Sequence, residues 1–137
     1  MELQVGVKIL LKNREGRFLL ARRNPKKYPE VGPKWDIVGG RIIPGMPLLE
    51  NIRREIKEET GLDYTGEPKL VAAQDILKVF NRHVVRLTYT GELDGEPEID
   101  EESLEAGWFS SAEIKTMDAE ILDGYFKELL DKKIIIL

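Results

Sequence analysis

Three glutamates share one arc of a helix that the sequence predicts between Pro47 and Gly61. Glu55, Glu58 and Glu59 stand at positions i, i+3 and i+4, so their side chains point the same way at 100° per residue. Like charges at this spacing cost an isolated helix roughly 0.2–0.5 kcal/mol per pair. A hard cation such as Mg²⁺ offsets that cost because it binds carboxylate and phosphate oxygens. The spacing therefore favours a helix with a metal-binding face.

The ends and the buried side of this helix can also be read from the sequence. Pro47 suits the first turn, and Gly61 suits a left-handed C-terminal stop. An apolar stripe runs beside the glutamates, so we expect the helix to bury one flank and keep its acids at the rim of a cleft. The stripe consists of Leu48, Leu49, Ile52 and Ile56.

The stretch from residue 40 to 62 resembles the Nudix box, GX5EX7REUXEEXGU, in which U is aliphatic. Gly40 takes the first position, and Arg54 and Glu55 follow at the box spacing. The match spans a loop, a helix and a second loop, which makes it far more specific than a lone glycine-rich loop. The other matching positions are Ile56, Glu58, Glu59, Gly61 and Leu62.

One fixed position of the box differs, because Met46 stands where the family has a glutamate. In the family that glutamate commonly supports the box arginine or approaches the metal. Arg54 then needs another acceptor here, since a partly buried guanidinium without a partner is costly. Glu50 and Glu58 each lie one helical turn from Arg54, so we expect an ion pair with one of them.

The resemblance implies one Nudix domain over residues 1–137, an α/β/α sandwich with a mixed β-sheet between helices. It also implies a Mg²⁺ site, in which Mn²⁺ can substitute, and a glutamate as general base. Glu55 or a residue of the 92–105 loop is the expected base. The implied catalytic residues are Arg54, Glu55, Glu58 and Glu59, and the implied metal ligands are the same three glutamates with a backbone carbonyl near Gly39.

A basic segment precedes the box. Residues 22–41 hold six basic side chains against two acids, which favours either a solvated loop or a phosphate-binding surface. Arg22, Arg23 and Arg41 are candidates to bind the substrate phosphates. Trp35 could stack on a base or, more simply, pack in the core.

An acidic segment follows the predicted strands of the second half. Residues 92–105 contain eight acids and no basic residue, which is typical of a solvated loop. The other interpretation is that this segment lends a carboxylate to the metal. Glu105, three residues before Trp108, resembles an acid that approaches the site in relatives, so it is a candidate metal ligand or base.

The remaining pattern predicts alternating strands and helices in the order βββ–α–βββ–α, typical of an α/β fold with helices on both faces of a sheet. A turn at 13–16 joins the first two strands in a hairpin, and Ser110 or Ser111 caps a helix. The expected strands are 3–12, 17–23, 35–38, 68–80, 82–93 and 104–109, with a further short extended piece at 41–43. The last helix is expected at 118–133, with Ile121, Leu122, Tyr125, Phe126, Leu129 and Leu130 on its buried side.

Composition narrows the functional classes. The 137 residues contain no cysteine, which excludes disulfides, thiolate metal sites and cysteine nucleophiles. The net charge of −4 argues against stable nucleic-acid binding, and no apolar run approaches the roughly 20 residues that span a bilayer. The N-terminus has no basic region typical of a signal peptide. We expect a cytoplasmic monomer or homodimer without a membrane partner.

These observations favour a Mg²⁺-dependent pyrophosphohydrolase that cleaves a nucleoside diphosphate linked to another moiety, its partner being a small nucleotide substrate. A nucleoside triphosphate, as in the MutT group, is the favoured substrate. Hydrolysis of ADP-ribose or a nucleotide sugar is the enzymatic alternative. A Nudix-fold module that senses a nucleotide without cleaving it is the other, and Met46 and Val38 are the residues that favour it.

Overall fold

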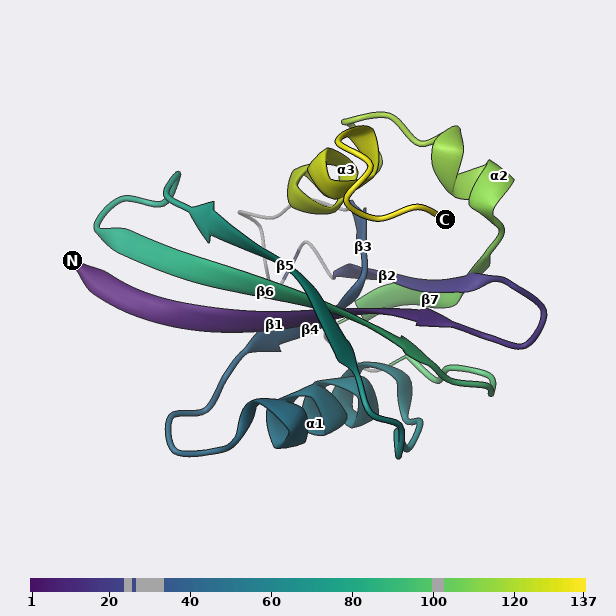
Figure 1. Ribbon diagram of the computed structural model, residues 1–137, viewed down its shortest axis with the longest axis horizontal. Helices are drawn as coiled ribbons and strands as arrows, with labels where there is room; N and C mark the ends of the chain where they lie inside the picture. The colour runs from purple at the N-terminus through teal and green to yellow at the C-terminus, as the bar shows by residue number, and fades with distance from the viewer. Residues whose placement is uncertain (24–25, 27–33, 100–102) are drawn as a thin grey trace.

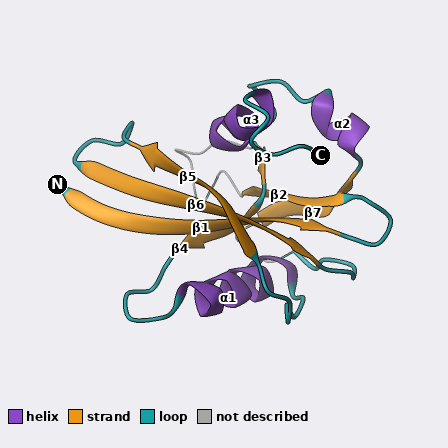
Figure 2. Ribbon diagram, in the orientation of Figure 1, coloured by secondary structure: helices purple, strands orange, loops and turns teal. Residues whose placement is uncertain are grey.

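The structure is a computed structural model that describes residues 1–23, 26, 34–99 and 103–137. Its described strands form one seven-stranded sheet, with α1 on one face and α2 and α3 on the other (Figures 1 and 2). The elements are β1 (Glu2–Lys12), β2 (Phe18–Arg23), β3 (Trp35–Asp36), β4 (Val38–Arg41), α1 (Leu48–Thr60), β5 (Lys69–Ile76), β6 (Arg82–Glu92), β7 (Ser103–Phe109), α2 (Ser111–Lys115) and α3 (Gly124–Asp131).

The sheet is mixed. Its central path runs β3–β2–β1–β6–β5, while β4 pairs with β1 and β7 pairs with β2. β1 and β6 are parallel over their whole length, from Glu2 opposite Arg82 to Lys12 opposite Glu92, and the other pairs are antiparallel. The predicted α/β/α arrangement with a mixed sheet is therefore confirmed.

The predicted N-terminal hairpin is correct only at its turn. Lys12 pairs with Phe18, and then the two strands separate. The chain that returns at residues 35–41 pairs with both of them, β3 with β2 and β4 with β1. The predicted strand 35–38 is consequently divided at Ile37, and the extended piece expected at 41–43 lies instead in a strand at Val38–Arg41.

Two apolar clusters flank the sheet, and β1 contributes to both because its side chains alternate. One cluster lies under α1 and the other under α2 and α3 (Figure 1). The α1 cluster comprises Val7, Ile9, Leu11, Leu19, Val38, Ile52, Ile56, Tyr64 and Tyr89. The α3 cluster comprises Leu10, Phe18, Leu20, Ile37, Ile114, Leu122, Phe126, Leu129 and Ile135.

Two predicted elements are too long. The strand predicted at 68–80 ends at Ile76, and the helix predicted at 118–133 begins only at Gly124. The helix starts late because residues 121–123 bond to β3: the N–H of Trp35 donates to the Ile121 carbonyl, and the N–H of Asp123 donates to the Trp35 carbonyl. Ile121, expected on the buried side, is exposed for the same reason.

Candidate active site

Helix α1 is fixed at both ends, as the sequence predicts. Its first turn follows Pro47, whose carbonyl accepts from the N–H of Asn51 at 3.0 Å. It stops at Gly61, which adopts the left-handed conformation with φ 75°. Ile52 and Ile56 are buried against the sheet and hold the helix axis in place. The glutamates on the neighbouring arc are therefore carried by a rigid element.

The three glutamates lie in different environments. Glu55 and Glu59 are buried, whereas the side chain of Glu58 is 50% exposed. Glu59 Oε2 accepts a hydrogen bond of 2.8 Å from the backbone N–H of Gly39, which ties α1 to β4. The glutamate face thus has a buried floor and a rim open to solvent, as expected for a site that meets a soluble ligand.

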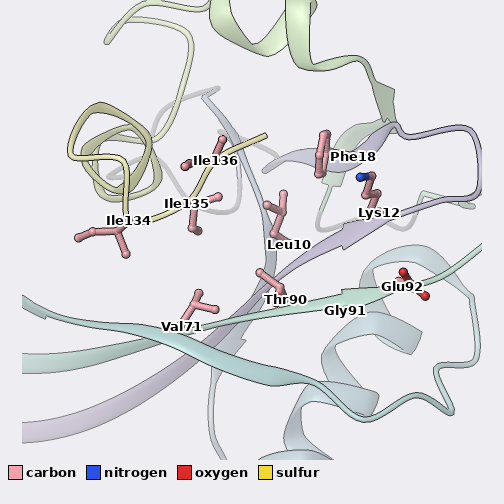
Figure 3. A pocket seen from close by; sticks show the side chains of 10 residues that line it. All are labelled: Leu10, Lys12, Phe18, Val71, Thr90, Gly91, Glu92, Ile134, Ile135 and Ile136. Atoms are coloured by element: carbon pink, nitrogen blue, oxygen red, sulfur yellow. The ribbon is translucent and has the colours of Figure 1, made fainter.

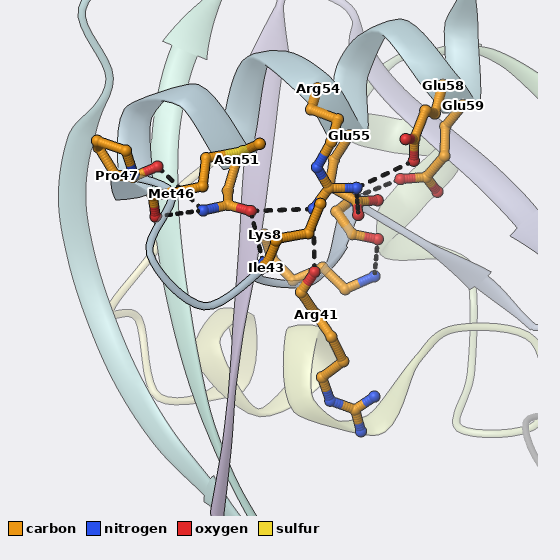
Figure 4. Close-up of polar contacts among 11 residues, drawn as sticks. Lys8, Arg41, Ile43, Met46, Pro47, Asn51, Arg54, Glu55, Glu58 and Glu59 are labelled. Atoms are coloured by element: carbon orange, nitrogen blue, oxygen red, sulfur yellow. Dashed lines mark hydrogen bonds and ion pairs between the residues drawn. The ribbon is translucent and has the colours of Figure 1, made fainter.

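Arg54 joins these carboxylates. Its Nη1 donates to Glu55 Oε1 at 2.8 Å and to Glu58 Oε2 at 3.1 Å (Figure 4). Its Nη2 donates to the carbonyl of Arg41 at 3.1 Å and to Asn51 Oδ1 at 3.0 Å. The predicted contact with Glu58 is confirmed, and these contacts take the place of the alternative pair with Glu50.

Gly39 and Gly40 let β4 pass between β1 and α1. A Cβ on Gly40 would lie 2.7 Å from Glu55 Oε2, and one on Gly39, where φ is 149°, would lie 1.9 Å from the Val7 carbonyl oxygen. The Gly39 contact is with the backbone and is sterically impossible, so that position requires glycine, whereas a side chain at Gly40 would force the Glu55 carboxylate to move. The box glycine therefore leaves room for the Glu55 carboxylate to lie against the backbone of β4.

Asn51 is a candidate site residue that the sequence analysis missed. It is fully buried, and its amide contacts the backbone of residues 43–47 as well as Arg54. Asparagine is a poor residue for a helix interior, and this one lies on the glutamate arc, four residues before Glu55 and three before the box arginine. That placement is the signal in the sequence that could have identified it.

The donor set suits a hard divalent cation, because the carboxylates on α1 and the nearby backbone offer only oxygen. Across the described parts of the chain, however, no three acidic or histidine side chains form a ready metal-binding group. Arg54 holds Glu55 and Glu58 in the present arrangement. The Gly39 carbonyl accepts from Lys8 Nζ at 3.4 Å. Binding a cation would therefore require these acceptors to reorient.

Three other predicted site residues gather on the opposite face of the sheet. Arg22 pairs with Glu105 and lies over the Trp35 ring, its guanidinium carbon 5.1 Å from the ring centroid. Trp35 packs edge-on against Phe109, with 4.7 Å between centroids, in the α3 cluster. Glu105 shares the face of Phe109 because the two are four residues apart in β7.

This placement corrects two predictions. Glu105 is not brought to the glutamates of α1, because strand alternation turns it to the α3 side, where Arg22 binds it. Arg22 is likewise absent from the glutamate face. Trp35 packs against the α3 cluster, as the packing alternative predicts.

The other two arginines differ. Arg23 ends β2, and its side chain lies outside the described residues. The Arg41 backbone carbonyl binds Arg54, but its guanidinium points away from the glutamates in Figure 4. Of the acidic segment, residue 98 lies beside the C-terminal end of α1, because the N–H of Glu98 donates to the Thr60 carbonyl at 2.7 Å.

A second cluster of charges, also missed by the sequence analysis, is buried on the α3 side. Arg86 bonds Asp36 at 3.1 Å and Asp123 at 3.2 Å, and Lys8 Nζ lies 3.0 Å from Asp36. Burial by itself raises the pKa of Asp36, but Arg86 and Lys8 outweigh it and lower the pKa to about 2. Burial and then the Asp36 charge raise the pKa of Asp123.

A pocket of about 340 Å³ also lies on this side, between the sheet and the C-terminal segment 134–136 (Figure 3). Leu10 and Phe18 of the α3 cluster line it, so a sheet and its apolar side chains separate it from the glutamates. It is therefore distinct from the candidate active site.

The family follows from comparison with known proteins. The sequence model that describes the NUDIX domain family matches residues 2–130 of this chain. The chain belongs to the Nudix family. Nudix hydrolases generally use divalent metal ions, which agrees with the oxygen donors on α1. A MutT protein from Methanosarcina mazei Go1 has the same fold, with a TM-score of 0.78 and 25% identity over 96% of this chain and 92% of that one.

Two curated relatives have named activities. An 8-oxo-dGDP phosphatase of Homo sapiens is 34% identical over 88 residues, which are 64% of this chain and 27% of that protein. An RNA pyrophosphohydrolase of Bartonella bacilliformis is 33% identical over 94 residues, 64% of this chain and 55% of that protein. The Nudix chain thus spans from about a quarter to just over half the length of these relatives. Among its described helices, none is long and apolar enough to cross a membrane.

Proposed function

We propose that this Nudix protein is a Mg²⁺-dependent pyrophosphohydrolase that cleaves a nucleoside diphosphate linked to another moiety, with a nucleoside triphosphate as the favoured substrate. One observation carries the proposal: Glu55, Glu58 and Glu59 lie on one face of α1, and Arg54 and the Gly39 N–H hold their carboxylates. A set of oxygen donors on one face of a rigid helix is what a phosphate-bound Mg²⁺ requires.

The roles follow from these positions. Glu55, Glu58 and Glu59 would hold Mg²⁺ or Mn²⁺, with the Gly39 carbonyl as a further oxygen. Such a metal would offset the negative charge of the phosphates and would activate water for attack. Arg54 orients two of the carboxylates and offsets their repulsion. Glu55, buried and adjacent to the backbone of Gly40, is our choice for the general base.

Substrate phosphates need cationic partners, and Arg23 is the remaining candidate at the end of β2. Replacing it with alanine should mainly raise KM by removing a charge-assisted contact. Matched replacement of Arg22, which is paired with Glu105 on the other face, should leave KM within about twofold.

The test is a panel of nucleotides incubated with Mg²⁺, with Mn²⁺ and with excess chelator, with products separated by ion-exchange chromatography. The panel includes the common triphosphates, 8-oxo-dGDP, 8-oxo-dGTP, ADP-ribose, nucleotide sugars and triphosphorylated RNA. We expect a nucleoside monophosphate and pyrophosphate from a triphosphate, and only with metal. Full turnover in chelator would refute the mechanism.

A second function, a nucleotide sensor without turnover, is favoured by Met46 at the one altered box position. The intact box glutamates argue against a sensor, and two of them, Glu55 and Glu58, bind Arg54 in the structure. Comparison of the wild type with Met46→Glu over the same panel separates the two. The sensor is correct if the wild type binds nucleotide without cleaving it and Met46→Glu alone restores cleavage.

A further inference from the structure

We propose that Asn51 is a positioning residue that takes over the support of Arg54 from the glutamate replaced by Met46, and thereby orients Glu55 and Glu58. The inference rests on the proposed function for its catalytic consequence. Its structural basis is independent of that function. A fully buried amide occupies the space between the box loop and the box arginine.

Every hydrogen-bonding position of the Asn51 amide is used. Oδ1 accepts from the N–H of Ile43 at 2.9 Å and from Arg54 Nη2 at 3.0 Å. Nδ2 donates to the carbonyls of Met46 at 2.8 Å and Pro47 at 3.0 Å. Both donors face the oxygen and both acceptors face the nitrogen, so only one orientation of the amide satisfies all four. The side chain is therefore locked.

The fixed Asn51 Oδ1 determines the orientation of the Arg54 guanidinium. Asn51 holds Arg54 Nη2, and the two box glutamates bind Nη1 of the same planar group. Arg54 Nε is buried and has no hydrogen-bond partner among the described residues, so its orientation depends on the two Nη groups. A shift at Nη2 must move Nη1, and with it Glu55 and Glu58.

The replacement also changes the charge of the site. If the family resemblance holds, a glutamate at position 46 would bring a negative charge to Arg54, whereas the Asn51 oxygen that binds Arg54 is neutral. A hydrogen bond from a guanidinium to a neutral oxygen is weaker than one to a carboxylate. The Asn51 contacts explain how Arg54 keeps its position although Met46 stands in the box. In an otherwise unchanged chain, Met46→Glu should therefore add a negative charge to the site without ordering Arg54 much further.

The first experiment uses metal-free protein and observes the side-chain Nη protons of Arg54 by NMR. In the wild type these protons should give separate signals, because the guanidinium cannot rotate. Asn51→Ala should average them, and adding Met46→Glu to that variant should restore them. Asn51→Asp should keep them, since it retains the acceptor, although it repels the Met46 and Pro47 carbonyls and lowers stability. Asn51→Ser replaces Asn51→Ala if the latter does not fold.

The second experiment measures Mn²⁺ affinity by titration calorimetry and the separate values of kcat and KM. Asn51→Ala should weaken Mn²⁺ binding about tenfold and lower kcat more than it raises KM, with recovery in the double variant. Ser110→Ala, which removes the cap of α2 on the other side of the sheet, is the matched control: it should lower the melting temperature and leave Mn²⁺ affinity unchanged.

Unchanged Arg54 signals in Asn51→Ala, or a double variant that restores neither signals nor Mn²⁺ affinity, would overturn the proposal for Asn51. A wild type that binds Mn²⁺ but cleaves no nucleotide would instead refute the hydrolase function. In that case the NMR comparison still decides the role of Asn51, because it requires neither metal nor substrate.

Discussion

Two arginines in this protein each bridge a pair of carboxylates, one on either side of the sheet. Arg54 binds Glu55 and Glu58 beside α1, and its side chain is 21% exposed. Arg86 binds Asp36 and Asp123 beside α3, and its side chain is only 5% exposed. The same ionic chemistry therefore occurs once at a rim that a ligand can reach and once in the interior.

The difference shows what each cluster can contribute. Charges at the rim keep part of their hydration, so the carboxylates there can change partners at modest cost. Charges in the interior depend on each other, and removing one leaves the others buried without compensation. We therefore expect changes around Arg54 to affect activity and changes around Arg86 to affect folding.

The largest effect should come from the rim. Glu58→Gln removes a carboxylate that is half exposed, so turnover should fall about a thousandfold, or about 4 kcal/mol, while the melting temperature stays nearly constant. Steady-state kinetics and thermal melts measure the two quantities. Glu50→Gln, an exposed change in the first turn of the same helix, is the control. Comparable activity in the two variants would show that Glu58 is not a catalytic residue.

Next in size is the interior cluster. Arg86→Met should lower the free energy of unfolding by about 3 kcal/mol, because Asp36 and Asp123 lose their shared partner and Lys8 compensates only the former. Urea denaturation gives the value. Arg53→Met, at an exposed position of α1, should change it by less than about 0.5 kcal/mol. Equal stability of the two variants would show that the cluster is not structural.

The interior cluster should also make stability depend on pH. Since the pKa of Asp36 falls from 3.8 to about 2 on folding, its stabilisation is complete above pH 3.8 and is lost as the pH drops through about 2. The loss corresponds to about 2 kcal/mol. The raised pKa of Asp123 acts in the opposite direction. Unfolding curves of wild type and Asp36→Asn at several acidic pH values should diverge above pH 4 and converge near pH 2.

The smallest effect concerns Glu105, which the sequence placed with the metal and the structure places with Arg22. Glu105→Gln should change kcat less than about threefold and stability by less than about 1 kcal/mol, as for other exposed ion pairs. Kinetics at limiting Mg²⁺ provide the most sensitive measurement. A large rise in the Mg²⁺ concentration that Glu105→Gln needs for activity would show that Glu105 contributes to the metal site.

Much of the rim could be predicted because its contacts are local. Glu55, Glu58, Glu59 and Arg54 lie within six consecutive residues of one helix, so helical periodicity alone brings them together. Asn51 belongs to the same helix but escaped attention, because its role depends on the path of residues 43–47. The contact between Glu59 and the Gly39 N–H depends on β4 in the same way.

The interior could not be predicted, because its four charges come from distant parts of the chain. Lys8, Asp36, Arg86 and Asp123 meet only after β1, β3, β6 and the start of α3 are assembled, and no spacing in the sequence encodes that meeting. The errors in strand 35–38 and helix 118–133 have the same origin, since Trp35 binds the backbone of residues 121–123.

The sequence by itself thus determined the boxed helix, its termini, its glutamate face and the family, because these depend on periodicity and on residue types at fixed spacing. Only the tertiary structure decided that Glu105 and Arg22 lie away from that face, that Asn51 supports Arg54, and that Arg86 is buried between two aspartates. The physical reason is that strand pairing and burial are set by contacts between distant segments, and a one-residue change in alternation moves a side chain to the other face of the sheet.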